Sequence, residues 1–430
     1  MLLTRVMANI LKNQTVGFRT WTQQTVLLLL CTFVLTGCSW FAWLPWVEAP
    51  AKETDLTKPT ELVDFDRELD ISRQWKSSIG NGLGRKYLRL NPAIVADYII
   101  VTDAYGHIEA RDRFTGKRVW QTQTHNLEKG FFDRINFIDR TDPSFIGGGV
   151  GAGLGLALLG TTYGEVVALN VSDGTERWRA DLGSEVLSAP AADRGRVFAQ
   201  TIDGRLVALD AQDGNLIWSY DDQVPILTLR GTSSPVVQGE IVYTGFASGK
   251  VSALRAENGE PIWEHRVMLP EGRSELDRMV DVDARPLVVG SALFAGAFQG
   301  RVKGISRRDG RPRWEREIST FLDLAEGYEQ IYVIDDEDTI TAIEQQSGEV
   351  VWTQESFKRR KLSAPIAFSN YLAFGDDEGY LHIIAQRDGR LMGRRKLDGD
   401  GIRSSMMYAD STLFVLGNSG SLHALTVDLK

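Results

Sequence analysis

A sixteen-residue pattern that recurs along the chain constrains the fold more than any other feature of the sequence. In the copy Asp203–Trp218, alternating apolar residues over Leu206–Asp210 predict a strand. Asp213 and Gly214 then predict a tight turn, and Leu216–Trp218 begins a return strand. The tryptophans that end the six clearest copies, each four positions after a glycine, are Trp120, Trp178, Trp218, Trp263, Trp314 and Trp352. Two degenerate copies follow: Glu378–Gly393 has no tryptophan, and Ser419–Val427 stops before its turn.

Eight copies spaced by roughly 40 to 60 residues, with short strands and no helical pattern, are typical of propeller blades. The sequence therefore predicts an all-β fold, an eight-bladed β-propeller of four-stranded antiparallel blades. We expect the repeat tryptophans to lie between adjacent blades, where a large rigid side chain buries much apolar area. The last copy lacks a return strand, while a spare tryptophan, Trp75, lies upstream in Ser72–Lys76. We predict that this N-terminal segment completes the last blade and closes the ring without leaving an open sheet edge.

The N-terminus has the pattern of a lipoprotein signal peptide over residues 1–37. Three basic residues precede an apolar run, Val26–Leu35, that is too short to span a bilayer. The run ends in Leu35–Cys38, which looks like a bacterial lipobox with Cys38 as the acylated residue. Ser39 after it resembles the enterobacterial signal for the outer membrane. An ordinary cleaved signal with an incidental Cys38 is the alternative, and Met7 is an alternative start.

Composition divides the remainder into two parts and excludes several functions. Residues 38–68 begin with an aromatic cluster and become rich in Pro, Glu and Asp, which predicts a flexible tether. The propeller is expected over residues 69–430. A net charge of −9 disfavours a nucleic-acid partner. The glycine-rich stretch 147–155 contains no GxGxxG or GxxxxGK motif, so we interpret it as strand glycines crowded near the propeller axis.

Motif searches assign no catalytic residue and no metal ligand. The five histidines are scattered, and neither HExxH nor GxSxG occurs. The acidic runs 335–338 and 376–378 fall at turns of the repeat, where aspartates are expected, although carboxylates in that density are also compatible with calcium.

Two stretches between blades, Val224–Pro235 and Ser274–Pro286, are candidates for a partner surface. The first contains Leu227, Leu229 and Arg230, and the second contains Asp281 and Asp283. Residues two apart in an extended segment point the same way, so we expect exposed leucines ringed by an arginine and two carboxylates. That composition is typical of an interface with an apolar centre and a polar rim. In this interpretation Arg230 pairs with a partner carboxylate, and the aspartates meet partner Lys or Arg. The alternative is that these residues are core where the chain joins a strand.

The lipobox, the Trp repeats and the motifs Leu227–Pro235 and Ser274–Asp283 together closely resemble the BamB family. These are propeller lipoproteins of the bacterial outer-membrane β-barrel assembly machinery, and the likeness runs from Cys38 to Lys430. The resemblance implies a non-enzymatic scaffold without a cofactor, lipid-anchored at the periplasmic face of the outer membrane. It also implies docking through the two loops on the POTRA domains of the integral barrel subunit, and contact with unfolded outer-membrane protein clients.

Pyrroloquinoline-quinone dehydrogenases share the repeat and provide the alternative from a different class. They are typically longer, bind calcium and place two adjacent cysteines over the cofactor, whereas this chain has only Cys31 and Cys38. A periplasmic propeller that binds a small ligand in its central funnel is a third possibility.

Overall fold

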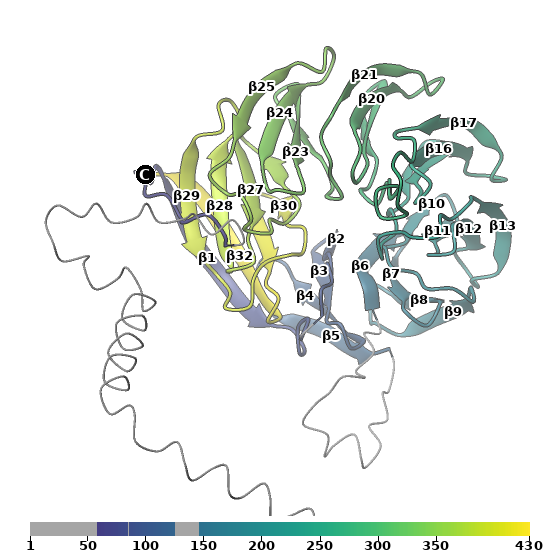
Figure 1. Ribbon diagram of the computed structural model, residues 1–430. Helices are drawn as coiled ribbons and strands as arrows, with labels where there is room; N and C mark the ends of the chain where they lie inside the picture. The colour runs from purple at the N-terminus through teal and green to yellow at the C-terminus, as the bar shows by residue number, and fades with distance from the viewer. Residues whose placement is uncertain (1–57, 85, 125–145) are drawn as a thin grey trace, which may run out of the picture. The chain divides into compact units, whose positions relative to one another are not determined.

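Four-stranded antiparallel sheets repeat around a ring in the computed structural model of the protein, which describes residues 58–84, 86–124 and 146–430 (Figure 1). Blade 1 contains β2 (Ala93–Val95), β3 (Tyr98–Thr102), β4 (His107–Asp112) and β5 (Arg118–Gln123). Blade 2 contains β6 (Ile146–Gly153), β7 (Leu156–Thr161), β8 (Glu165–Asn170) and β9 (Glu176–Asp181). Blade 3 contains β10 (Ala191–Asp193), β11 (Arg196–Gln200), β12 (Arg205–Asp210) and β13 (Leu216–Asp221). Blade 4 contains β14 (Val236–Gln238), β15 (Ile241–Gly245), β16 (Lys250–Arg255) and β17 (Pro261–Arg266).

The second half of the ring has the same organisation. Blade 5 contains β18 (Leu287–Val289), β19 (Ala292–Gly296), β20 (Val302–Ser306) and β21 (Pro312–Arg316). Blade 6 contains β22 (Ala325–Gly327), β23 (Gln330–Ile334), β24 (Ile340–Glu344) and β25 (Val350–Gln354). Blade 7 contains β26 (Ile366–Phe368), β27 (Tyr371–Gly375), β28 (Tyr380–Ala385) and β29 (Leu391–Lys396). Blade 8 contains β30 (Met407–Ala409), β31 (Thr412–Leu416), β32 (Ser421–Leu429) and β1 (Leu69–Ser78). The predicted eight-bladed propeller is confirmed.

The repeat tryptophan of one blade packs against the turn glycine of the next blade. Trp178 of blade 2 donates its indole N–H to the Ala211 carbonyl of blade 3, 3.0 Å away. Gly214 follows that carbonyl with φ +76°, and a Cβ there would lie 2.6 Å from Trp178 Cε3. The glycine therefore provides both the left-handed turn and the space for the preceding blade's indole. Six further pairs repeat this contact: Trp75 with Gly116, Trp120 with Gly174, Trp218 with Gly259, Trp263 with Gly310, Trp314 with Gly348, and Trp352 with Gly389.

The way the ring closes explains why the seventh and eighth copies of the repeat are degenerate. β1 pairs antiparallel with β32 from Leu69↔Leu429 to Ser78↔Ser421, and Figure 1 shows the purple strand beside the yellow one. Because β1 is the outer strand of blade 8, that blade has no hairpin glycine to receive a tryptophan from blade 7. Gly393 takes the tryptophan position in blade 7 and lies against Ile71 and Leu69 of β1. The predicted closure by an N-terminal strand is confirmed.

The compact unit that contains the propeller begins at Pro59, ten residues before β1. Thr60 donates its backbone N–H to the Lys358 carbonyl at 3.0 Å, and Arg394 donates to the Val63 carbonyl at 3.1 Å. Residues 59–68 are thus attached to blade 7, and the tether expected over 38–68 ends earlier than the sequence pattern indicates. The signal peptide, Cys38 and the segment up to residue 57 lie outside the described residues.

Glycines in β6 allow blade 2 to approach closely the segment that leads into the inner strand of blade 3. A Cβ on Gly147 would lie 2.6 Å from the Val186 carbonyl oxygen, and one on Gly148 would overlap the Ser188 backbone. This is the crowding near the axis that the sequence predicts, and β6 continues directly into the strand hairpin with β7.

The ring has two faces, which we name by the connections they carry. The loop face carries the connections between blades, and the Phe298 N–H donates there to the Asp281 carbonyl. The hairpin face carries the turns inside each blade that precede the second and fourth strands, and the Arg307 N–H donates there to the Ser291 carbonyl. In the described part of the chain, no helix is long and apolar enough to cross a membrane.

Candidate interaction surface

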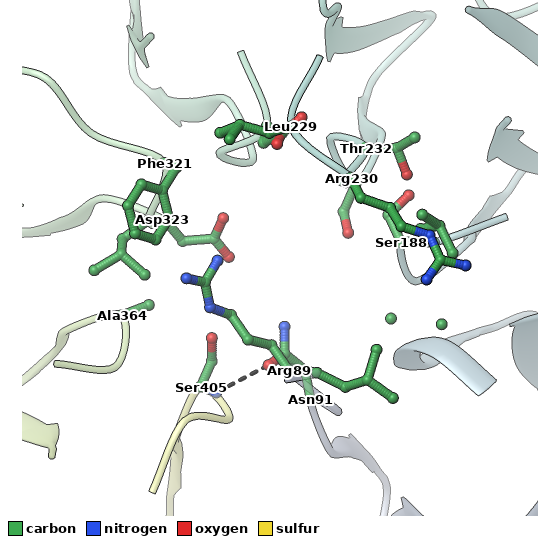
Figure 2. Close-up of a pocket in the computed structure, with 18 of the residues that line it drawn as sticks. Arg89, Asn91, Ser188, Leu229, Arg230, Thr232, Phe321, Asp323, Ala364 and Ser405 are labelled. Atoms are coloured by element: carbon green, nitrogen blue, oxygen red, sulfur yellow. Dashed lines mark hydrogen bonds between the residues drawn. The ribbon is translucent and has the colours of Figure 1, made fainter. Parts of the chain in front are cut away.

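A cavity of about 460 Å³ opens at the axis of the ring. It is lined by the segments just before or within the innermost strand of every blade, represented by Arg89, Gly148, Ser188, Leu229, Asp283, Phe321, Ala364 and Ser405. Figure 2 shows the labelled side chains arranged around this space. Both candidate loops reach it, because Leu229 and Arg230 come from the first loop and Asp283 from the second.

The first loop exposes apolar side chains beside the cavity. Ile226 is 89% exposed, Leu227 41% and Val224 41%. We call these three residues the apolar loop patch. Sequence reasoning placed Leu227 and Leu229 on one side, but the backbone bends at Ile226, Leu227 and Arg230 and breaks the strand alternation. Leu229 is consequently half-buried in the cavity wall, and Ile226, missed from the sequence, is the most exposed apolar residue of the loop.

Arg230 lies on the surface and already has a carboxylate partner within the chain. Its guanidinium donates to both oxygens of Glu185, with Nη2 2.9 Å from Oε1 and Nε 3.3 Å from Oε2. The Arg230 side chain is 64% exposed, so this pair is worth little to folding stability. A partner carboxylate at Arg230 has to replace or share the bond to Glu185, a residue that the repeat pattern did not single out.

Asp281 does not reach the surface, so the expectation that both aspartates meet basic partner groups does not hold for it. It is completely buried, and its Oδ1 accepts the Leu229 backbone N–H at 3.1 Å. Burial raises the pKa of Asp281 to about 6, although the N–H from Leu229 lowers it. Asp281 therefore fixes the position of the first loop through this buried hydrogen bond.

Asp283 lies in the cavity wall next to the first loop. Gly231 packs against it so closely that a Cβ would lie 2.5 Å from its Oδ2. Burial, together with the neighbouring charge of Asp281, raises the pKa of Asp283 to about 7, and Arg89 opposes this shift. The two loops are joined again at their ends, where the Ser233 hydroxyl donates to the Ala284 carbonyl at 3.1 Å.

Arg89 is a cavity residue that sequence reasoning missed. Its guanidinium carbon lies 4.7 Å from the centroid of the Phe321 ring, and Figure 2 shows the group directed toward Phe321 and Asp323. Arg89 lies four residues before β2, at the position that Thr232 has before β14, so an alignment of the segments before each innermost strand places it next to the cavity but does not pair it with Arg230.

The acidic runs serve as turn acceptors. Asp335 accepts the N–H groups of Glu337 and Thr339, and Asp376 pairs with Arg360 at 2.8 Å and His382 at 2.9 Å. Among the residues that the structure describes, no three His, Cys, Asp or Glu side chains are grouped so that they could hold a metal ion.

Comparison with known proteins gives the family. A family model described as outer membrane protein assembly factor BamB matches residues 104–354. A protein of that name from Pseudomonas aeruginosa is 40% identical over 369 residues, which cover 86% of this chain and 92% of that protein. The chain belongs to the BamB family. The crystal structure of BamB from Moraxella catarrhalis has a TM-score of 0.73 at 24% identity, covering 83% of this chain and all of that one.

The propeller fold is also found in a dehydrogenase. A europium-containing methanol dehydrogenase has a TM-score of 0.65 at 14% identity, covering 83% of this chain and 93% of that chain. At this identity the likeness shows the propeller fold alone, whereas membership of the BamB family rests on sequence identity over most of the chain.

Proposed function

We propose that the protein is a non-enzymatic outer-membrane protein assembly factor that docks on a partner through its loop face. Membership of the BamB family supports the assembly role. The observation that carries the docking proposal is the apolar loop patch beside Arg230, since exposed apolar side chains rimmed by charge are typical of interfaces.

The partner in this proposal is the integral barrel subunit, bound through its periplasmic POTRA domains, with unfolded outer-membrane proteins as clients. Leu227 and Ile226 supply apolar contact, and Arg230 pairs with a partner carboxylate. Asp281 acts indirectly by positioning Leu229, and Asp283 shapes the wall of the cavity beside the loop. Acylation at Cys38 anchors the propeller at the periplasmic face of the outer membrane.

The Arg230→Ala variant tests the docking surface. Removing one member of a desolvated charge pair costs about 2–5 kcal/mol of binding, enough to disrupt a micromolar complex. We expect this variant to lose the barrel subunit in co-purification from detergent-extracted membranes. Its thermal midpoint should stay that of the unchanged protein, because the side chain is largely exposed.

Glu185→Ala is the matched control, because it removes the other half of the same surface pair. If Arg230 serves a partner carboxylate, Glu185→Ala frees it and binding is kept or strengthened. Equal loss in both variants would mean that the pair only shapes the loop. A folded Arg230→Ala, Ile226→Asp double variant that still retains the barrel subunit would rule out this surface.

A further inference from the structure

A second cavity, of about 450 Å³, lies between blades 4 and 5 on the hairpin face. Its polar lining consists of Tyr243 from blade 4 and Ser291, Ser306, Arg307, Arg308 and Arg313 from blade 5. No Asp or Glu lines it. It is therefore a concave site lined by three arginines and by residues that carry hydroxyl groups, a composition suited to an oxyanion.

Two of the arginines are held in position by neutral groups. Arg307 donates from Nε to the Tyr243 hydroxyl and from Nη1 to the Gly290 carbonyl, each at 2.9 Å. Arg313 donates from Nη2 to the carbonyl and the hydroxyl of Ser291, at 2.8 and 2.9 Å. Because these partners carry no negative charge, they fix the guanidinium groups without neutralising them.

Basic residues outnumber acidic ones in the part of blade 5 that lines the cavity. Residues 301–316 contain seven Arg or Lys and two acidic residues, in a chain whose net charge is −9. Arg301 and Lys303 are paired with Glu315 elsewhere on the blade. The nearest carboxylate in sequence, Asp309, does not line the cavity and lies 3.9 Å from Arg311. A hydrogen bond with Ser306 and, to a smaller extent, the charges of Arg311 and Arg308 lower the pKa of Asp309, so it offsets part of the positive charge at the cavity rim. Arg307, Arg308 and Arg313 have no acidic partner within 4 Å in the described protein.

The repeat itself does not require these arginines. At the positions of Ser306, Arg307 and Arg313, blade 7 has Ala385, Gln386 and Met392. The same positions in blade 4 are occupied by Arg255, Ala256 and Ile262. Both blades fold with the same four-stranded topology, so the cluster in blade 5 serves something other than the sheet.

We propose that the cavity between blades 4 and 5 binds a phosphate group, carried either by a membrane lipid headgroup or by a small soluble phosphate. Planar guanidinium groups match the tetrahedral oxyanion through bidentate hydrogen bonds, and fixed groups lose less entropy on binding than free side chains. The site lies on the face opposite the apolar loop patch, so it is independent of the docking proposal and can be occupied in the docked protein.

Calorimetric titration of the full chain in an uncharged detergent tests the proposal. The probes are inorganic phosphate, glycerol 3-phosphate and dihexanoyl phosphatidic acid. We expect binding that weakens with salt and that falls by at least about tenfold in the Arg308→Ala, Arg313→Ala double variant. Binding at least tenfold tighter for the short-chain lipid than for the soluble probes identifies a headgroup site, and similar affinities identify a soluble phosphate.

Arg387→Ala is the matched control, because Arg387 occupies the position of Arg308 in blade 7, where the other two arginines are absent. Its affinities should equal those of the unchanged protein. Equal binding by the double variant, equal loss in Arg387→Ala, or no binding of any probe at millimolar concentration would overturn the proposal. Chemical modification gives an independent readout: phosphate should slow the reaction of phenylglyoxal with Arg308 and Arg313, mapped by mass spectrometry, and leave Arg387 unprotected.

Discussion

A buried carboxylate such as Asp281, or one buried beside another carboxylate as Asp283 is beside Asp281, binds its proton more tightly in the folded protein than in the unfolded chain. The pKa values of about 6 and about 7 stand above the ordinary value of 3.8. Between about pH 4 and pH 7 the folded state therefore holds more protons than the unfolded state. The contribution of these two groups to stability is present below about pH 4 and is lost as the pH rises through 6 and 7.

Asp281→Asn removes one of these groups and keeps an oxygen that can accept the Leu229 N–H. We expect the variant to gain stability relative to the unchanged protein as the pH is raised from about 4.5 to 8, by on the order of 2 kcal/mol. Urea unfolding of both proteins across this range measures the difference. Buried His382 and His423, whose pKa values are lowered by burial, give the opposite slope but are common to both proteins. Parallel stability curves would contradict the assignment.

Single residues were the part of the candidate site that the sequence could predict least. The motif indicated that Leu227, Arg230 and Asp281 belong to one region, and the structure brings their loops together. Which of them faces solvent depends on bends in a loop without periodicity and on a neighbouring blade about 50 residues away. The Arg230–Glu185 pair and the burial of Asp281 both come from such contacts, which no local pattern encodes.

At the level of elements, β1 determines whether blade 8 is a complete sheet. Trp75 donates its indole N–H to the Arg113 carbonyl at 3.0 Å and packs against Gly116 of blade 1. We expect Trp75→Ala to lower the free energy of unfolding by about 3–5 kcal/mol, as large-to-small core substitutions do. Thermal and urea unfolding measure the loss.

Two comparisons test whether the stability lost in Trp75→Ala comes from the packing of Trp75 against Gly116. Deleting residues 40–56 should leave the stability unchanged, because this stretch precedes the compact unit. Gly116→Ala should cost more than Gly195→Ala: both have positive φ, but only the first places its Cβ against an indole, whereas nothing lies within 4 Å of the second. If the deletion and Trp75→Ala shift the midpoint equally, the closure does not depend on this tryptophan.

Strands and their order were predictable because each repeat has its own period-two pattern and turn signal, as in Asp203–Trp218. The attachment of residues 59–68 to blade 7 was not predictable from the sequence. The segment forms no strand: its N–H groups donate to backbone carbonyls at Lys358 and Met392, and its oxygens accept from the side chains of Arg360, Arg390 and Arg394. The composition of residues 59–68 is typical of a tether. The groups to which these residues bond come together only when blade 7 is folded.

For the whole molecule, the proposed acylation at Cys38 would decide where the propeller acts. Each buried CH₂ of an acyl chain contributes about 0.8 kcal/mol of membrane affinity, so acylation of Cys38, as proposed, would be enough to hold the propeller at the bilayer. We expect Cys38→Ala to lose palmitate labelling and to leave the outer-membrane fraction. Cys31→Ala, the other cysteine of the chain, should be processed and labelled normally. A Cys38→Ala protein that is still cleaved at this site and labelled would contradict the anchor.

Because Leu69 pairs with Leu429, blade 8 can be completed only after the C-terminal strand has been made. The first strand of the ring has its partner in the last one, so β1 has nothing to pair with until nearly the whole chain has been synthesised and exported. Closing a loop of that length costs more entropy than any hairpin contact within a blade. Seven blades can form in order as they emerge, while the eighth waits for both ends. Until then each end presents an unpaired strand edge, and a chain that stalls late in export leaves an open ring that is prone to aggregation.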